Sequence, residues 1–102
     1  MAAYMRLYVL DLGAIMLSPS CAMAARREGG EYRIPVSSFL LTHPAGNVLF
    51  DTGMDPLTIT QPALVWGPLL SQLTPEMGQS DHIVRRLNEV GVRPSSIRYV
   101  VL

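Results

Sequence analysis

The sequence predicts an α/β layered fold of the α+β kind, in which helices cover a sheet. Three observations predict it. A hairpin is expected from Val36 to Phe50, an amphipathic helix from Asp81 to Val90, and a strand from Ile97 to Leu102 whose residues from Tyr99 onward are apolar on both faces. Such a strand is typical of the centre of a sheet, and amphipathic helices cover sheets of this kind.

The first strand is predicted at Arg6 to Leu12, with a bend or bulge at Gly13 to Ile15 as its end. The sequence from Met16 to Glu31 favours no element, and its last six residues, with two arginines and two glycines, are typical of an exposed loop. An extended segment follows from Tyr32 to Thr42. Pro35 within it indicates a sheet edge or a strand start, because proline has no N–H for the ladder.

The hairpin turn is predicted at His43 to Asn47, where a proline, a glycine and an asparagine favour a turn. Val48 to Phe50 returns as a short buried strand, and Asp51-Thr52-Gly53 breaks it. The next segment, from Met54 to Gln79, contains four prolines and is expected to be a long loop. Loops of this length often cover or bind ligands.

The helix is predicted to begin after Ser80 as its N-cap, with Asp81 in the first turn. Gly91 is expected to end it in the left-handed conformation. One stripe of the helix is apolar and should face the core, and the opposite stripe should face solvent. The inward residues are Ile83, Val84, Leu87 and Val90, and the outward residues are Arg85, Arg86 and Glu89.

Composition favours a partial domain over a complete one. The 102 residues are 49% hydrophobic and 16% charged, which is little polar surface for a chain of this size. An apolar face is therefore expected to meet something else. Eight arginines balance eight acidic residues, so no basic field exists to attract nucleic acid.

The single cysteine, Cys21, predicts no internal disulfide and is typical of a reducing cytosol, so we expect a cytoplasmic protein. It is expected to be a small, partly buried apolar residue, with a nucleophilic role as the weaker alternative. A secretory signal peptide with its cleavage site at Ala22-Met23-Ala24 stays a minor alternative, because Asp11 interrupts the apolar run. No segment has the length and the freedom from charge that a membrane span needs.

Three segments, taken in order, resemble metallo-β-lactamase-superfamily hydrolases. They are Pro35 to Met54, which ends on the Asp51-Thr52-Gly53 turn, the helix from Asp81 to Val90, and Gly91 to Leu102. Two further phrases, Met5 to Gly13 and Tyr32 to Val36, look most like N-acyl-homoserine lactone lactonases. The resemblance implies that residues 1–102 form one partial domain, the amino-terminal part of an αββα sandwich that ends just before a His-x-His-x-Asp-His motif.

The resemblance also implies the chemistry. Members of the family bind two metal ions, usually zinc, through five histidines and two aspartates, and a metal-bound hydroxide opens the lactone ring. We expect all of these ligands beyond Leu102, so residues 1–102 alone should contain no catalytic residue and no metal ligand and should be inactive. His43 and His82 are expected to be surface residues, since neither has ligand spacing to a second donor.

Six residues are candidates for a site. By resemblance, Asp51, Thr52 and Gly53 should support the metal-binding loop through hydrogen bonds without touching metal. The plainer alternative is that the Asp51 side chain only caps its own turn. The candidates for an apolar acyl-chain pocket are Met16, Trp66 and Phe39, each of which is otherwise a core or subunit contact.

Three functional hypotheses remain open from the sequence. The first is a zinc-dependent hydrolase that takes a small lactone substrate and has no nucleic-acid or membrane partner. The second is a non-catalytic product, a truncated chain that either folds poorly or pairs with a partner that supplies the remaining sheet. A homodimer also stays open. The third is a small binding module whose contacts come from the segment Asp55 to Gln79.

Overall fold

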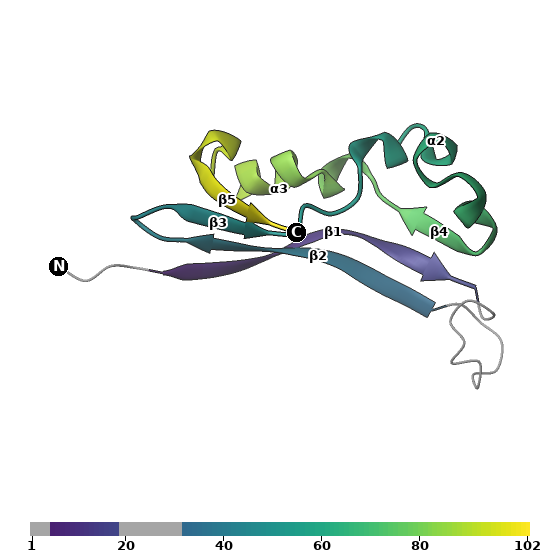
Figure 1. The fold of residues 1–102 in the computed structure, drawn as a ribbon, viewed down its shortest axis with the longest axis horizontal. Coiled ribbons are helices and arrows are strands. Elements are labelled where there is room, and N and C mark those ends of the chain that lie inside the picture. Colours follow the sequence, from purple (N-terminus) through teal and green to yellow (C-terminus); the bar gives the residue numbers. More distant parts are fainter. Residues whose placement is uncertain (1–4, 19–31) are drawn as a thin grey trace.

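The computed structural model describes residues 5–18 and 32–102, which form a five-stranded mixed sheet with its helices on one side (Figure 1). The strand order is β4-β1-β2-β3-β5. The strands are β1 (Arg6–Leu17), β2 (Tyr32–Thr42), β3 (Asn47–Phe50), β4 (Leu73–Glu76) and β5 (Ile97–Val101). The α-helices are α2 (Pro62–Trp66) and α3 (Ile83–Glu89), and 3₁₀ turns lie at Pro56–Thr58, Gly67–Ser71, Gln79–Asp81 and Pro94–Ser96. The α+β architecture expected from the sequence is confirmed.

Three sequence interpretations fall outside the described residues. They concern Cys21, the cleavage site Ala22-Met23-Ala24 and the loop from Arg26 to Glu31. Within the described ranges, no helix is both long and apolar enough to cross a membrane.

Strand β1 is longer than predicted. The expected irregularity is present, because the pairing register with β2 shifts between Asp11 and Ala14, and Gly13 has φ +105°. It does not end the strand. A bulge adds one residue without stopping the ladder, so β1 continues to Leu17 and pairs there with β4 as well as β2.

The β2–β3 hairpin is confirmed, with Phe39, Leu40 and Leu41 opposite Phe50, Leu49 and Val48. Beyond this short ladder β2 pairs with β1 alone in the described structure. Pro35 lies in that stretch, opposite Ala14 of β1, where the other side of β2 has no partner strand in the described structure. The predicted edge position of Pro35 is therefore correct.

The segment from Met54 to Gln79 is not a structureless loop. It contains a 3₁₀ turn, α2, a second 3₁₀ turn and β4, which pairs antiparallel with the end of β1. Its prolines lie where their missing N–H groups do little harm, at helix first turns and in the edge strand β4. Each proline of this segment thus lies in the first turn of a short helix or in β4.

Helix α3 begins at a different residue from the one predicted. Its N-cap is His82, whose Nδ1 accepts a hydrogen bond from the backbone N–H of Val84 at 3.1 Å, while Ser80 lies in the preceding 3₁₀ turn. The end at Gly91, with φ +78°, is as predicted. Val84 was expected to face inward and is instead 39% exposed, because it lies on the opposite side of Leu87 from Ile83 and Val90, which pack on the core.

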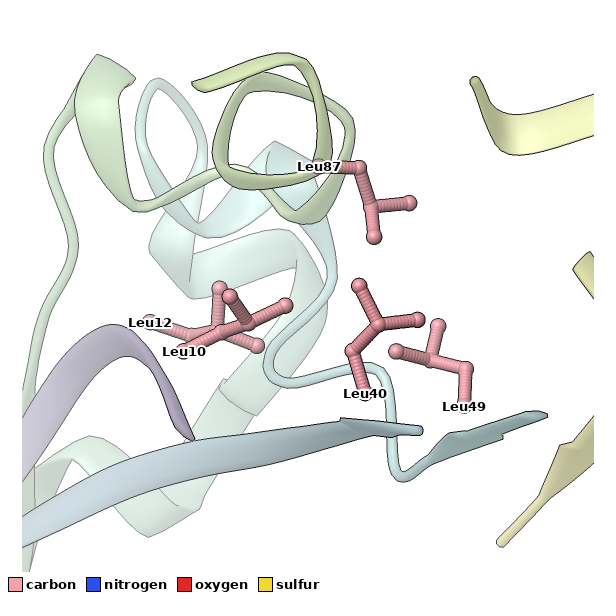
Figure 2. Close-up of a cluster of buried hydrophobic side chains, with 5 residues drawn as sticks. All are labelled: Leu10, Leu12, Leu40, Leu49 and Leu87. Carbon is pink, nitrogen blue, oxygen red and sulfur yellow. The ribbon is translucent and has the colours of Figure 1, made fainter. Parts of the chain in front are cut away.

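The core lies between α3 and one face of the sheet, which we call the covered face. Figure 2 shows Leu87 of α3 pointing toward the leucines of β1, β2 and β3. All are at most 4% exposed. The cluster consists of Leu10, Leu12, Leu40, Leu49 and Leu87, with Tyr8, Val36, Ile83, Val90, Val92 and Ile97 packed at its edge.

The other side of the sheet, which we call the open face, is also apolar but exposed. Register places one set of side chains on it from β1, β2, β3 and β5. They are Leu7, Val9, Phe39, Phe50, Tyr99 and Val101, each between 38% and 65% exposed. Strand β5 was expected to be central and buried. It lies instead at one edge of the described sheet, beside β3, and its residues from Arg98 to Val101 are exposed.

Candidate functional site

The Asp51-Thr52-Gly53 turn leaves the end of β3 and holds its own shape. Asp51 has φ +69°, which side-chain-bearing residues rarely adopt and which aspartate tolerates better than most. Its Oδ1 accepts hydrogen bonds from the backbone N–H groups of Thr52 at 2.7 Å and Gly53 at 3.3 Å. The self-capping role weighed from the sequence is therefore present.

Hydrogen bonds with Ser38 and Val101 fasten this turn to the sheet. The hydroxyl of Ser38, fully buried on β2, lies 3.0 Å from the carbonyl oxygen of Phe50 and 2.6 Å from that of Asp51, so its proton is shared between them. The N–H of Asp51 donates to the carbonyl oxygen of Val101 at 2.7 Å. Asp51 therefore lies directly beside the carboxyl end of β5.

The turn also rests on the bulge of β1. Gly53 has φ +78°, and a Cβ built on it would lie 2.6 Å from Cδ1 of Leu12. Met54, which is 8% exposed, follows at once, and its Cε is 3.1 Å from where a Cβ of Gly13 would be. Only glycine permits this close approach at position 53.

The Asp51 carboxylate is exposed, and its Oδ2 accepts no hydrogen bond from the part of the chain that the structure describes. An exposed carboxylate with one oxygen engaged in its own turn can accept hydrogen bonds from a neighbouring loop through the other. The turn is thus held in place by its contacts with the sheet, and Oδ2 of Asp51 remains available as an acceptor.

The three pocket candidates do not converge. Phe39 lies on the open face between Val9 and Phe50. Trp66 belongs to α2 on the opposite side of the sheet, where its Nε1 donates to Oγ1 of the buried Thr58 at 3.1 Å. Met16 is half-buried near the end of β1, opposite Arg33 and Thr74. Their contact with a ligand stays a prediction.

The described residues do not fit a metal ion. No three of their His, Cys, Asp and Glu side chains gather in one place. The Nδ1 atoms of both histidines accept backbone hydrogen bonds, His43 from Ala45 at 3.0 Å and His82 from Val84 at 3.1 Å. One ring nitrogen of each histidine is therefore engaged in a local turn or helix cap.

Two residues that matter to the site were not identified from the sequence. Ser38 lies next to Ser37 within β2, and only its hydrogen bonds to Phe50 and Asp51 show that it contacts the turn. Arg86 was expected to face solvent with Arg85. It instead donates from Nε to the carbonyl oxygen of Asp11 in the β1 bulge at 2.7 Å. Neither contact leaves a local sequence signal, because each joins residues far apart in the chain.

Comparison with known proteins gives a consistent result. No protein-family profile matches the sequence. The N-acyl homoserine lactonase AttM of Azorhizobium caulinodans is 31% identical over 96 residues, which are 94% of this chain and 36% of that protein. The N-acyl homoserine lactonase AiiA of Bacillus thuringiensis subsp. kurstaki is 32% identical over 97 residues, 94% of this chain and 39% of that protein.

Solved structures agree with the sequence matches. An N-acyl homoserine lactone hydrolase, solved with the product N-hexanoyl-L-homoserine at its catalytic metal centre, aligns with a TM-score of 0.77 and 32% identity. The alignment covers 98% of this chain and 40% of that one. The chain thus spans well under half the length of the relatives it matches. In sequence and in fold, it is homologous to the N-acyl homoserine lactonases and corresponds to their amino-terminal part.

Proposed function

We propose that this chain is the first part of a metal-dependent hydrolase that opens the lactone ring of N-acyl homoserine lactones. The proposal is carried by one observation. Over 94–98% of the chain, both the sequence and the fold agree with the lactonases described above. In this proposal, residues 1–102 build one layer of the protein and hold a turn beside the metal centre. The proposal also includes two zinc ions, a small lactone substrate and a cytoplasmic location.

The position of Asp51 supports its proposed role. Its N–H is bonded to Val101, so any chain that continues from β5 starts next to the Asp51 carboxylate. Oδ2 can then accept hydrogen bonds from the backbone of that continuation and fix its shape. The turn is held by the hydrogen bond from Ser38 to Asp51 and by the packing of Gly53 on Leu12. Thr52 and Gly53 would serve by shaping the turn.

Met16, Trp66 and Phe39 remain our candidates for contact with the acyl chain. Met16 and Trp66 are half-buried, so part of each side chain is available to a ligand. Phe39 is 42% exposed on the open face, which a second layer of the complete protein would cover. An acyl chain needs a mainly apolar lining, which all three side chains provide.

The test begins with the coding sequence beyond codon 102. If it encodes Ser-His-x-His-x-Asp-His, the complete protein should hydrolyse N-hexanoyl-homoserine lactone, lose this activity to a chelator and regain it with zinc. Residues 1–102 alone, purified in parallel, should be inactive. A complete protein that carries the motif and is loaded with zinc, yet leaves the lactone intact, would refute the proposal.

The role of Asp51 has a matched control. Asp51→Asn in the complete protein should lower kcat/KM about 10- to 100-fold, because supporting residues of metal sites contribute that much. Asp55 also caps a turn, since its Oδ1 accepts a hydrogen bond from the N–H of Leu57 at 2.9 Å, but none of the described hydrogen bonds joins it to β5. Asp55→Asn should leave kcat/KM nearly unchanged. Equal effects of the two substitutions would remove the special role of Asp51.

The open face favours a second candidate function, a non-catalytic interaction module. Six large apolar side chains exposed on one sheet face form a surface of the kind that associates with other proteins. A stop codon directly after codon 102, together with a stable, monodisperse complex of the chain with itself, would favour this candidate over the hydrolase.

A further inference from the structure

Arg86 contacts three separate parts of the chain. Its Nε donates to the carbonyl oxygen of Asp11 at 2.7 Å, its Nη1 to Glu89 at 3.0 Å and its Nη2 to Asp81 at 3.2 Å. The side chain is 24% exposed. The hydrogen bond with Glu89 raises the pKa of Arg86, burial opposes this, and the charges of Glu89 and Asp81 add to it. The guanidinium therefore stays charged and donates to all three partners.

Of these contacts, the one to Asp11 joins two layers. Glu89 lies on α3 and Asp81 in the turn before it, so both bonds stay within the helical layer. Asp11 lies at the start of the β1 bulge, where its Oδ1 also accepts from the N–H of Gly13 at 3.2 Å. Arg86 thus holds the bulge from the helix side.

The bulge in turn supports the site. Leu12, the residue after Asp11, is fully buried, and Gly53 packs directly against its side chain. Met54 packs against Gly13 in the same way. A series of contacts therefore runs from Arg86 through Asp11 and Leu12 to Gly53. The N–H of Gly53 in turn donates a hydrogen bond to the Asp51 carboxylate.

We propose that Arg86 is a positioning residue for the Asp51-Thr52-Gly53 turn and acts on it through the β1 bulge. This inference rests on the proposed function, since the turn matters to a reaction only if the complete protein is the hydrolase. Arg86 touches neither Asp51 nor Gly53 in the described contacts. Its effect must therefore travel through the packing of Leu12, which is dense and transmits small shifts.

The variant Arg86→Met in the complete protein keeps the apolar stem and removes the donors. We expect kcat to fall about tenfold while KM changes less than about twofold, since hydrogen bonds from charged groups contribute on this scale. Two controls flank it. Arg85→Met removes the neighbouring exposed arginine, and Glu89→Gln breaks an ion pair of Arg86 but leaves the bond to Asp11. Both should keep kcat near the parent value.

A double-mutant cycle separates positioning from general weakening. Arg86 and Asp51 make no direct contact, so independent effects would multiply. If Arg86 acts through the turn, adding Arg86→Met to Asp51→Asn should lower kcat little further. Multiplicative effects on kcat would overturn the inference.

Amide exchange tests the positioning without any need for activity. In Arg86→Met, the amides of Asp51 and Thr52 should exchange faster, while those of Leu40 and Leu49 in the hairpin should not. Unchanged exchange at the turn, or equal acceleration in the hairpin, would overturn the inference. If the complete protein has no lactonase activity, the proposed function fails, and the exchange result alone still decides whether Arg86 positions the turn.

Discussion

The covered and open faces of the sheet carry similar side chains in different surroundings. Leu40 and Phe39 are neighbours on β2 and point to opposite faces, yet Leu40 is fully buried and Phe39 is 42% exposed. On the covered face, α3 closes over the leucines (Figure 2). Apolar sequence alone therefore does not make a core, because a core also needs a second layer to exclude water.

The largest expected effect contrasts these two neighbours. Leu40→Ala should lower the free energy of unfolding by about 2–5 kcal/mol, because it leaves a cavity in a closed core. Phe39→Ala in the 102-residue chain should cost only about 1 kcal/mol, the scale of cross-strand pairing. Urea unfolding followed by tryptophan fluorescence would measure both. In the complete protein the cost of Phe39→Ala should rise toward that of Leu40→Ala, and an unchanged cost there would mean that nothing covers the open face.

The next effect contrasts two glycines with the same φ of +78°. Gly53→Ala should destabilise the chain by about 2–3 kcal/mol, because the new Cβ combines backbone strain with overpacking against Leu12. Gly91→Ala should cost about 1 kcal/mol, since a Cβ there meets nothing within 4 Å and only the strain remains. Thermal unfolding midpoints would rank them. Equal shifts would show that the turn and the bulge are not tightly packed.

A smaller effect on stability is expected at Val9, which lies on the open face opposite Phe39. Val9→Lys should change the free energy of unfolding by less than about 1 kcal/mol, because the side chain is already 65% exposed. It should nevertheless reduce self-association of the 102-residue chain, as a charge breaks an apolar patch. Sedimentation velocity at several concentrations would show this. Association that persists in Val9→Lys would indicate that the chains associate through the edge of the described sheet at β5 instead.

The smallest effect on stability is expected for removal of an exposed ion pair, that between Arg33 and Glu76. Arg33 and Glu76 pair across β1 at 3.2 Å, with side chains 57% and 44% exposed. Solvent screens such pairs, so Arg33→Met should cost at most about 0.5 kcal/mol. A comparison of unfolding at low and high salt would check it. A larger loss would mean that the pair shields the buried Ala14 beneath it.

Much of the fold could be predicted from local patterns. The β2–β3 hairpin, the edge position of Pro35 and the end of α3 at Gly91 each depend on a few adjacent residues whose backbone preferences agree. The location of the β1 irregularity was also predicted, but the continuation of the strand beyond it was not. In the sequence, a glycine such as Gly13 indicates a bulge and a strand end equally well, since both use positive φ.

The remaining differences come from tertiary contacts. Strand β4 has a proline and only four residues, and it forms because the end of β1 offers a partner. His82 displaces Ser80 as the N-cap because the preceding residues form a 3₁₀ turn. The surroundings of Asp51 depend on Ser38, Leu12 and Val101, which are distant in sequence, so the candidate turn could be named in advance but its supports could not.

The pairing of β3 with β5 has a consequence for the newly made protein. Asn47 and Ile97 lie opposite each other in this parallel ladder although fifty residues separate them, while the hairpin partners of β2 and β3 lie close in sequence. On the ribosome the hairpin can therefore form first, and the Asp51 turn receives its bond to Val101 only after β5 has emerged. Before α3 has emerged, the nascent chain exposes the apolar side chains of the covered face as well as those of the open face, and chaperones that recognise such surfaces can bind during this interval.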